Sequence, residues 1–335
     1  MRVLTFGEML MRLTSNATTR LHQSNIFTYY YGGAEANVAI SLANFGLDTT
    51  YVTKLPEQAI GHACMHYLRS HQVDTKEIVL GGDRLGIYFV EAGIGDRQSQ
   101  VTYDRKYSSF QQIKKEELDW ERILDNVDIF HTTGITLALS EELQDITVIA
   151  MQKAKEKGIK VSFDFNFRAK LWTQHDASVA IKKVLPYVDI AFCNHMDAMY
   201  LLNMKEIDVE SHEEILKHYY KQINEQYPSI SIFASTKRNV LTSSKHELEG
   251  YVYHNGKLSK TSMYTIDPVI DRIGGGDAYA AGILYGYSQQ WEMKRIVSFA
   301  TAASVLKHTI EGDGNAFSVE EVEQFIQSNN KEISR

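Results

Sequence analysis

Short apolar runs with strand composition alternate with helical patterns along most of this chain, and no other feature constrains its fold as strongly. After a strand-like run at 2–6, similar runs lie within 127–134, 159–166, 188–194 and 229–236, with helical patterns between the earlier members of the series. Such alternation is typical of a mostly parallel sheet with helices on both faces. We therefore predict an α/β fold of three layers.

Two stretches break this rhythm, at about 8–34 and 83–107. The runs at 84–93 and 99–107 both read as strands, with no helical pattern between them. Because they have no helix to cover them, we expect these segments to project from the main sheet as a small β lid. We expect one domain over residues 1–330, built from the sheet, its helices and this lid.

Composition narrows the class of protein. The chain has 335 residues, 44% hydrophobic, with only 4 prolines and a net charge of −7. This charge argues against nucleic-acid binding, which usually needs a basic surface, and no run approaches the ~20 apolar residues of a membrane span. The two cysteines form no CxxC pair, and the first residues lack a signal-peptide pattern, so we expect a cytoplasmic protein.

Ligands of open α/β sheets bind at the carboxyl ends of the strands, so the turns there are the places to look for chemistry. The chain has no GxxxxGK[ST] sequence and no GxGxxG after its first strand. These absences remove the usual support for a P-loop protein and for a dinucleotide-binding protein.

One glycine-rich stretch, DRIGGGDAYAAG at 271–282, allows two interpretations. Backbone N–H groups of Gly274, Gly275 and Gly276, with a helix N-terminus behind them, can form an anion site. Asp277 would then lie beside the anion as a base that accepts a hydroxyl proton. Alternatively, Asp277 only caps the helix, since Asp is a favoured cap residue.

A second constellation, YYYGGAEANVA, covers residues 29–39. Gly32 and Gly33 let the backbone approach a ligand, and Asn37 in the first helical turn offers both donors and an acceptor, which suits hydroxyl recognition. The alternative is a turn followed by a tightly packed helix, and this motif alone favours that simpler interpretation.

Together, these two stretches resemble the two signature regions of the ribokinase-like sugar kinases, in the same order and at a matching spacing. The resemblance covers essentially the whole chain and implies the ribokinase-like fold and an ATP-dependent transfer to a sugar hydroxyl. It makes Asp277 the catalytic base and Gly274, Gly275 and Gly276 the anion hole. Arg272 and Gly275 are mild departures from the family's usual motif, D-T-x-G-A-G-D.

The resemblance also implies how the cofactors are held. It implies ATP with Mg²⁺, the metal being supported through water by Asn194 and Asp197, and K⁺ as a monovalent cation near Asp271. In addition to the glycine turn, the residues expected to border ATP are Asn166, Arg168, Ser235, Lys237 and Arg238.

The segment VSFDFNFRAKLW at 161–172 resembles a stretch of 2-keto-3-deoxygluconate kinases, which implies that a sugar acid is phosphorylated on its 6-hydroxyl. Arginine suits a carboxylate because its planar fork donates two parallel hydrogen bonds. The expected substrate contacts are Gly33, Asn37, Tyr88, Tyr103, Arg105, Arg168 and Asp313.

Alternatives remain for both arginines and for the substrate. Arg105 could form a surface ion pair, and Arg168 could contact ATP phosphates. Many family members that act on neutral sugars carry an Asp about where Arg12 stands, and such an acid would repel an acidic substrate. A fructokinase or a ribokinase is the alternative function. We also expect the lid strands to favour a homo-oligomer, since sheet edges need cover.

Overall fold

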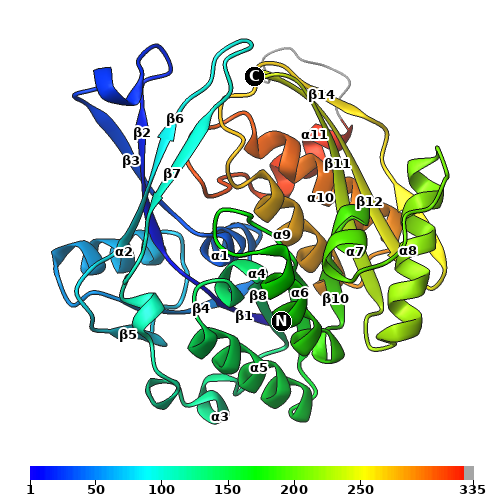
Figure 1. The fold of residues 1–335 in the computed structure, drawn as a ribbon, viewed down its shortest axis with the longest axis horizontal. Coiled ribbons are helices and arrows are strands. Elements are labelled where there is room, and N and C mark those ends of the chain that lie inside the picture. The colour runs from blue at the N-terminus through cyan, green and yellow to red at the C-terminus, as the bar shows by residue number, and fades with distance from the viewer. Residues whose placement is uncertain (328–335) are drawn as a thin grey trace.

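A computed structural model describes residues 1–327, and one large β-sheet organises this part of the chain (Figure 1). Its strands are β1 (Arg2–Phe6), β4 (Asp48–Leu55), β5 (Ile78–Leu80), β8 (Ile129–Thr133), β9 (Lys160–Asp164), β10 (Ile190–Phe192), β11 (Ile232–Thr242), β12 (Lys245–His254), β13 (Lys257–Lys260) and β14 (Tyr264–Ile266). The order is β13-β12-β11-β10-β9-β8-β1-β4-β5, with β14 paired to β12. Strands from β11 to β5 run parallel, whereas β12 pairs antiparallel with its three neighbours.

Helices cover both faces of this sheet. The helices α1 (Ala34–Asn44), α9 (Gly275–Ser288), α10 (Met293–Lys307) and α11 (Val319–Gln327) pack on one face. On the other face lie α3 (Trp120–Ile123), α4 (Gly134–Leu137), α5 (Glu141–Glu156), α6 (Gln174–Val184), α7 (His195–Leu201) and α8 (His212–Gln226). A further helix, α2 (Ala59–Ser70), packs with α1 beside β4. The α/β prediction is therefore confirmed, with a sheet between two helical layers.

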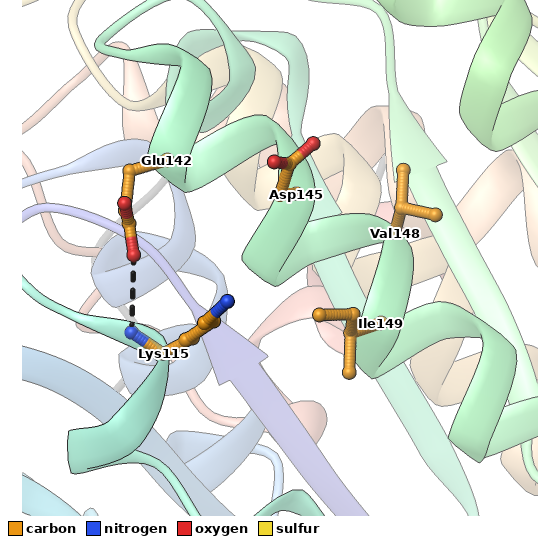
Figure 2. Close-up of a pocket in the computed structure, with 5 residues that line it drawn as sticks. All are labelled: Lys115, Glu142, Asp145, Val148 and Ile149. Atoms are coloured by element: carbon orange, nitrogen blue, oxygen red, sulfur yellow. Dashed lines mark hydrogen bonds between the residues drawn. The ribbon is translucent and has the colours of Figure 1, made fainter.

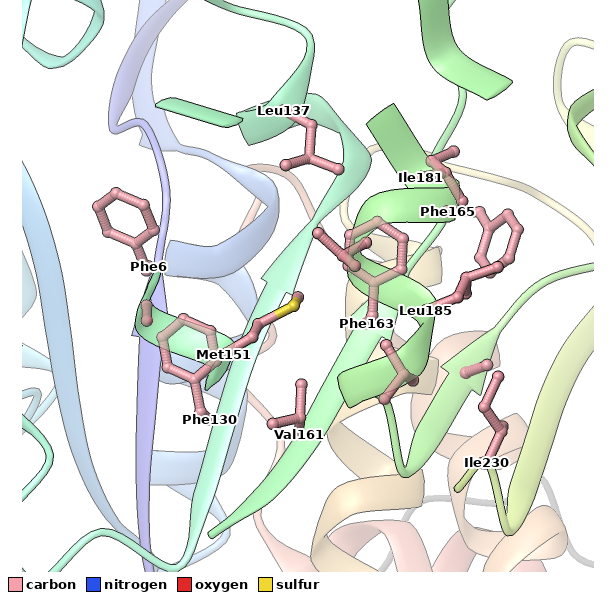
Figure 3. Close-up of a cluster of buried hydrophobic side chains, with 14 of the residues drawn as sticks. Phe6, Phe130, Leu137, Met151, Val161, Phe163, Phe165, Ile181, Leu185 and Ile230 are labelled. Carbon is pink, nitrogen blue, oxygen red and sulfur yellow. The ribbon is translucent and has the colours of Figure 1, made fainter. Parts of the chain in front are cut away.

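The central strands are buried on both faces. Val3 and Ile129 point toward α9 and α10, whereas the next residues, Leu4 and Phe130, point into the opposite layer. Figure 3 shows part of that second layer, where Phe130 lies among side chains of neighbouring strands and helices. Continuous apolar runs, rather than alternating ones, are what a parallel sheet with two covered faces requires.

A second, four-stranded sheet forms the lid. Its strands are β2 (Leu10–Ser15), β3 (Phe27–Gly32), β6 (Gly86–Glu91) and β7 (Gln100–Asp104), in the order β3-β2-β6-β7. In Figure 1 this sheet stands away from the main body, coloured blue and cyan. All four strands fall within the two stretches that break the βα rhythm, as predicted. The single domain over 1–330 stays a prediction, and its last residues, 328–330, lie outside the described residues.

Local signals placed most boundaries correctly. Gly46, with φ of 85°, follows the end of α1, and Asn255-Gly256, both with positive φ, form the turn between β12 and β13. Within residues 1–327, no helix has the length and apolar character that crossing a membrane demands. The two cysteines, Cys64 and Cys193, are both buried and free.

Candidate active site

The glycine turn lies at the N-terminus of α9, and its three glycines have different surroundings. Gly274 is the N-cap residue in the left-handed region, with φ of 82°, and a Cβ there would meet the Asp313 carbonyl. A Cβ at Gly275 would collide with the His308 ring, whereas a Cβ at Gly276 would meet nothing within 4 Å. The fold thus requires the first two glycines. The open space at Gly276 is available to a ligand, beside N–H groups that begin a helix.

Asp277 occupies the first turn of α9 but does not cap it. Its carboxylate accepts a hydrogen bond of 2.7 Å from Asn37 Nδ2 at the start of α1, so the two signature motifs meet in space although they lie 240 residues apart. Burial raises the pKa of Asp277 to about 7, while the Asn37 hydrogen bond and Arg168 oppose the rise. A carboxylate with this pKa suits general-base work near neutral pH.

Two more carboxylates extend this acidic region. Burial first, and then the charge of Asp277, raise the pKa of Asp164 to about 7, and burial raises that of Asp197 to about 6. Asp164 ends β9 and accepts hydrogen bonds from the Asn166 backbone and side chain. The prediction omitted Asp164, although it opens the same DFNFR segment as Arg168 and could have been found from its position at a strand end.

Three arginines lie near one another, and the charge of one of them, Arg168, also acts to lower the pKa values of the three carboxylates. Arg168, Arg238 and Arg272 are exposed, and none forms an ion pair within residues 1–327. Although solvent reaches Arg238, surrounding protein removes part of its hydration, and this desolvation, then Arg272 and Arg168, lower its pKa to about 10. Like charges gathered in this way favour a polyanionic ligand.

Other residues expected near the cofactors also have structural roles. Asn194 caps α7, and Asp197 accepts from the Asn194 backbone, so the pair forms a reciprocal capping box. Ser235 is buried and accepts a hydrogen bond of 2.8 Å from Tyr220. Lys237 is partly exposed on β11, the strand that also carries Arg238.

The glycine pair before α1 accommodates the protein's own atoms. A Cβ at Gly32 would meet the Asp313 carboxylate, and one at Gly33 would meet the Glu8 carbonyl. These glycines therefore serve the packing of Asp313 and Glu8, where the sequence had suggested approach to a ligand. The Tyr88 hydroxyl donates to Asp313 Oδ2, and the Tyr88 and Tyr103 rings lie 6.1 Å apart.

Arg105 makes an ion pair that neither sequence interpretation included. Its Nε donates to Glu8 Oε2 over 2.8 Å, its Nη2 donates to the same oxygen, and Ser108 donates to the other oxygen of Glu8. Arg105 and Glu8 are 5% and 2% exposed, so this is a buried pair. Arg105 Nη1 makes no hydrogen bond within residues 1–327, and the guanidinium carbon lies 5.7 Å from the centre of the ring of the lid residue Tyr103.

Arg12 reaches from the lid into the body of the protein. It is 1% exposed, and its Nη2 lies 2.5 Å from Asp271 Oδ2, its Nε 3.2 Å from Asp313 Oδ1. On β2 it pairs with Tyr30 on one side and Tyr88 on the other, with the Tyr30 ring 4.4 Å from its guanidinium. Arg12 therefore connects the lid to Asp271, just before the glycine turn, and to Asp313, in the segment that packs against the turn.

Comparison with known proteins identifies the family to which this site belongs. The sequence pattern of the pfkB family of carbohydrate kinases matches residues 1–319 of this chain. The chain belongs to this family.

Solved and curated members of the pfkB family agree on the architecture but carry different substrate names. A 2-dehydro-3-deoxygluconokinase structure from Thermotoga maritima has a TM-score of 0.94 at 38% identity, covering 98% of this chain and 100% of that one. A 2-dehydro-3-deoxygalactonokinase of Haloferax volcanii is 27% identical over 335 residues, 99% of each chain. The sequence resemblance to the ribokinase-like kinases is thus confirmed, and the chain is a carbohydrate kinase.

One solved structure with the same fold contains two of the expected cofactors, ATP and Mg²⁺. A putative ribokinase II from E. coli, solved with ATP and Mg²⁺, has a TM-score of 0.80 and covers 97% of this chain and 99% of that one. At 20% identity this likeness shows the fold alone.

In this pfkB chain the lid tip touches the turn between β11 and β12 of the main sheet. Ser243, in the turn between β11 and β12, donates through its N–H to the Gly95 carbonyl over 2.8 Å and through its hydroxyl to the Arg97 carbonyl over 2.6 Å. Lys170, after β9, donates to the Val101 carbonyl on β7 over 2.7 Å. The lid is therefore hydrogen-bonded to two segments of the main body.

A separate surface hollow lies away from this chemistry. Figure 2 shows it between α5 and the short 3₁₀ helix at Lys115–Glu117, with a volume of about 220 Å³. Its lining residues are Lys115, Glu142, Asp145, Val148 and Ile149. The glycine turn, Asp277, Asp164, Asp197 and the three exposed arginines are not among these residues, so the hollow is separate from the candidate active site.

Proposed function

We propose that this kinase transfers the γ-phosphoryl group of ATP to the 6-hydroxyl of 2-keto-3-deoxy-D-gluconate, giving 2-keto-3-deoxy-6-phosphogluconate. The observation that carries the substrate proposal is Arg105. Glu8 fixes its guanidinium, which leaves Nη1 to donate beside Tyr103 at the lid. A preoriented, desolvated cation next to an aromatic ring suits the carboxylate of a sugar acid and gives little to a neutral sugar.

Asp277 is the general base in this proposal. As the 6-hydroxyl oxygen attacks the γ-phosphorus, its proton passes to the Asp277 carboxylate, the bond to the β,γ-bridging oxygen breaks, and ADP leaves. The hydrogen bond from Asn37 orients the carboxylate. The first turn of α9 lies beside the open space at Gly276, and its N–H groups would stabilise the charge that develops on the phosphoryl group, since such fixed dipoles need no reorganisation.

The nucleotide side fits ATP with Mg²⁺. Arg168, Arg238 and Arg272 form no ion pair within residues 1–327 and can neutralise phosphate oxygens. Within residues 1–327 no group of three or more ligating side chains could hold a metal by itself. Mg²⁺ is usually bound by phosphates, waters and one or two carboxylates, and Asp164 and Asp197 could supply those. When bound, the metal would neutralise phosphate charge.

An ADP-release assay across a substrate panel tests the proposal. The panel contains 2-keto-3-deoxygluconate, its galactonate-derived epimer, fructose and ribose. We expect the highest kcat/KM for the gluconate-derived acid. A preference for the epimer would move the proposal to the other sugar acid, consistent with the name of the Haloferax relative. Equal or faster turnover of fructose or ribose would contradict the sugar-acid proposal.

A further inference from the structure

Four charged side chains are packed together behind the glycine turn. The cations are Arg12 and Lys307, and the anions are Asp271 and Asp313. Arg12, Lys307 and Asp313 are 1%, 0% and 2% exposed, so solvent does not neutralise them. Buried charges persist only when they are paired or otherwise compensated, so the four must balance one another.

The Asp271 carboxylate already has its partners. Oδ2 accepts from Arg12 Nη2 over 2.5 Å and from the Gly312 N–H over 3.2 Å, and Oδ1 accepts from the Ile273 N–H over 3.0 Å. Ile273 directly precedes the glycine turn and Gly312 directly precedes Asp313. Asp271 thus links the turn to the segment that packs against it.

Lys307 stands at the end of α10, directly beneath the turn. A Cβ at Gly274 would lie 3.3 Å from Lys307 Cε, and the only hydrogen bond of its ammonium within residues 1–327 is a long one, 3.4 Å, to the Ile310 carbonyl. Burial lowers the pKa of Lys307, and the charges of Asp271 and Asp313 oppose that fall. An ammonium has three donors, and this one makes a single long hydrogen bond and no ion pair within 4.0 Å among residues 1–327, so Asp271 and Asp313 act on it from a longer distance.

This arrangement does not fit the monovalent cation that the family resemblance implied near Asp271. A K⁺ ion would need the Asp271 carboxylate and the neighbouring carbonyls as ligands, but Arg12 binds that carboxylate and Lys307 uses the Ile310 carbonyl. We propose that Arg12 and Lys307 are positioning residues that replace the monovalent cation, so that the positive charge behind the glycine turn is covalently built in and the enzyme needs no K⁺.

In the proposed phosphoryl transfer, this cluster would help to stabilise the negative charge of the transferred group. A fixed positive charge behind the turn holds Gly274 against the Asp313 carbonyl and adds to the field of the α9 N-terminus. For this purpose the inference rests on the proposed function. The packing argument itself does not depend on which sugar is phosphorylated.

The first test needs no variant. Turnover of the unmodified enzyme on its best panel substrate is measured in chloride salts of K⁺, Na⁺ and tetramethylammonium at matched ionic strength. We expect kcat to differ by less than about twofold between the salts, because Arg12 and Lys307 would already occupy the monovalent-cation site. Activation by K⁺ of about tenfold or more would overturn the proposal.

Two substitutions at Lys307 then separate charge from packing. Lys307→Ala removes the ammonium and leaves room for a small cation, whereas Lys307→Met removes the charge and fills the space. In tetramethylammonium we expect both to lose on the order of tenfold in kcat. K⁺ or NH₄⁺ should restore Lys307→Ala but not Lys307→Met, and equal behaviour of the two in every salt would overturn the proposal. Lys294→Ala, an exposed site on the same helix, is the control.

Thermal unfolding without sugar or ATP provides an independent result. K⁺ should raise the Tm of Lys307→Ala relative to tetramethylammonium, because an ion that binds only the folded state stabilises it. The Tm values of the unmodified protein, Lys307→Met and Lys294→Ala should not respond. If these shifts occur while no sugar acid is phosphorylated, the proposed function fails and the built-in cation stands. If Lys307→Ala shows no K⁺-specific shift, the built-in cation fails whatever the substrate.

Discussion

The arginines on the two sides of the active site are compensated in opposite ways. On the sugar side, Arg105 is paired with the buried Glu8, and Arg12 is paired with Asp271 and Asp313. On the side that we propose for the nucleotide, Arg168, Arg238 and Arg272 form no ion pair within residues 1–327, and desolvation followed by neighbouring arginine charge lowers the pKa of Arg238 and of Arg272. Arginine is therefore held in ion pairs within the folded protein on one side, whereas on the other side its charge has no acidic partner among residues 1–327.

The difference teaches what each side does before its ligand arrives. A buried ion pair holds a guanidinium in one orientation, so the side that we propose for the sugar is preorganised. Unpaired, mutually repelling cations cost stability until a polyanion neutralises them, so the nucleotide side is prepared to bind phosphates. Asp277 lies where the two sides meet, and it feels both Arg168 and Asp313.

The largest expected effect comes from removing the base at this meeting point. Asp277→Asn keeps an oxygen for the Asn37 hydrogen bond but cannot take the 6-hydroxyl proton. We expect kcat to fall on the order of 10³-fold while calorimetry shows nearly unchanged ATP binding. Asp145→Asn, at an exposed position on α5, is the matched control. Retained turnover in Asp277→Asn would refute the base assignment.

The paired side is tested next, through Arg105→Met. This change leaves the Glu8 carboxylate buried without its cation, so we expect a loss of roughly 3 kcal/mol in the free energy of unfolding, measured by urea denaturation. The KM for the sugar acid should also rise, because its carboxylate ligand is gone.

A double variant separates these two roles of Arg105. Arg105→Met combined with Glu8→Gln removes both charges, so much of the stability should return while the KM for the acid stays high. If the KM is unchanged in both variants, Arg105 is a structural residue only and the substrate proposal loses its main support.

The pH dependence of the reaction tests whether burial raises the pKa of the base, Asp277. Burial raises the pKa of Asp277 to about 7, so protons inactivate the base as the pH falls through that value. We expect kcat/KM to be constant above about pH 7.5 and to decrease about tenfold per unit below about pH 6.5. A rate that is constant down to about pH 5 would mean an ordinary carboxylate pKa and would contradict the role of burial.

The smallest effect is expected from the unpaired side. Arg238→Gln removes one of three repelling cations, so the free energy of unfolding should stay the same or rise by roughly 0.5 kcal/mol. The KM for ATP should nevertheless rise by about tenfold. A clear loss of stability on this change, as expected for Arg105→Met, would break the contrast between the two sides.

Sequence patterns predicted much of this molecule. Glycines, helix periodicity and apolar runs placed the ends of α1 and α9 within a few residues, because these signals are local. The resemblance then brought Asn37 and Asp277 to one site, and their hydrogen bond agrees with that expectation. Local patterns did not identify Glu8, Lys307 or Asp164, although Asp164 lies in the segment 161–172, which was singled out for Arg168.

The sequence by itself determined the α/β layers, the lid and the glycine turn, since hydrophobic period and backbone freedom are properties of short segments. Only the tertiary structure decided which charges are neutralised. Arg12 meets Asp271 across 259 residues and Arg105 meets Glu8 across 97 residues, and no local pattern encodes such pairs. The energy of interaction between two charges depends on their burial and on the distance between them, and both are defined only after the chain has folded.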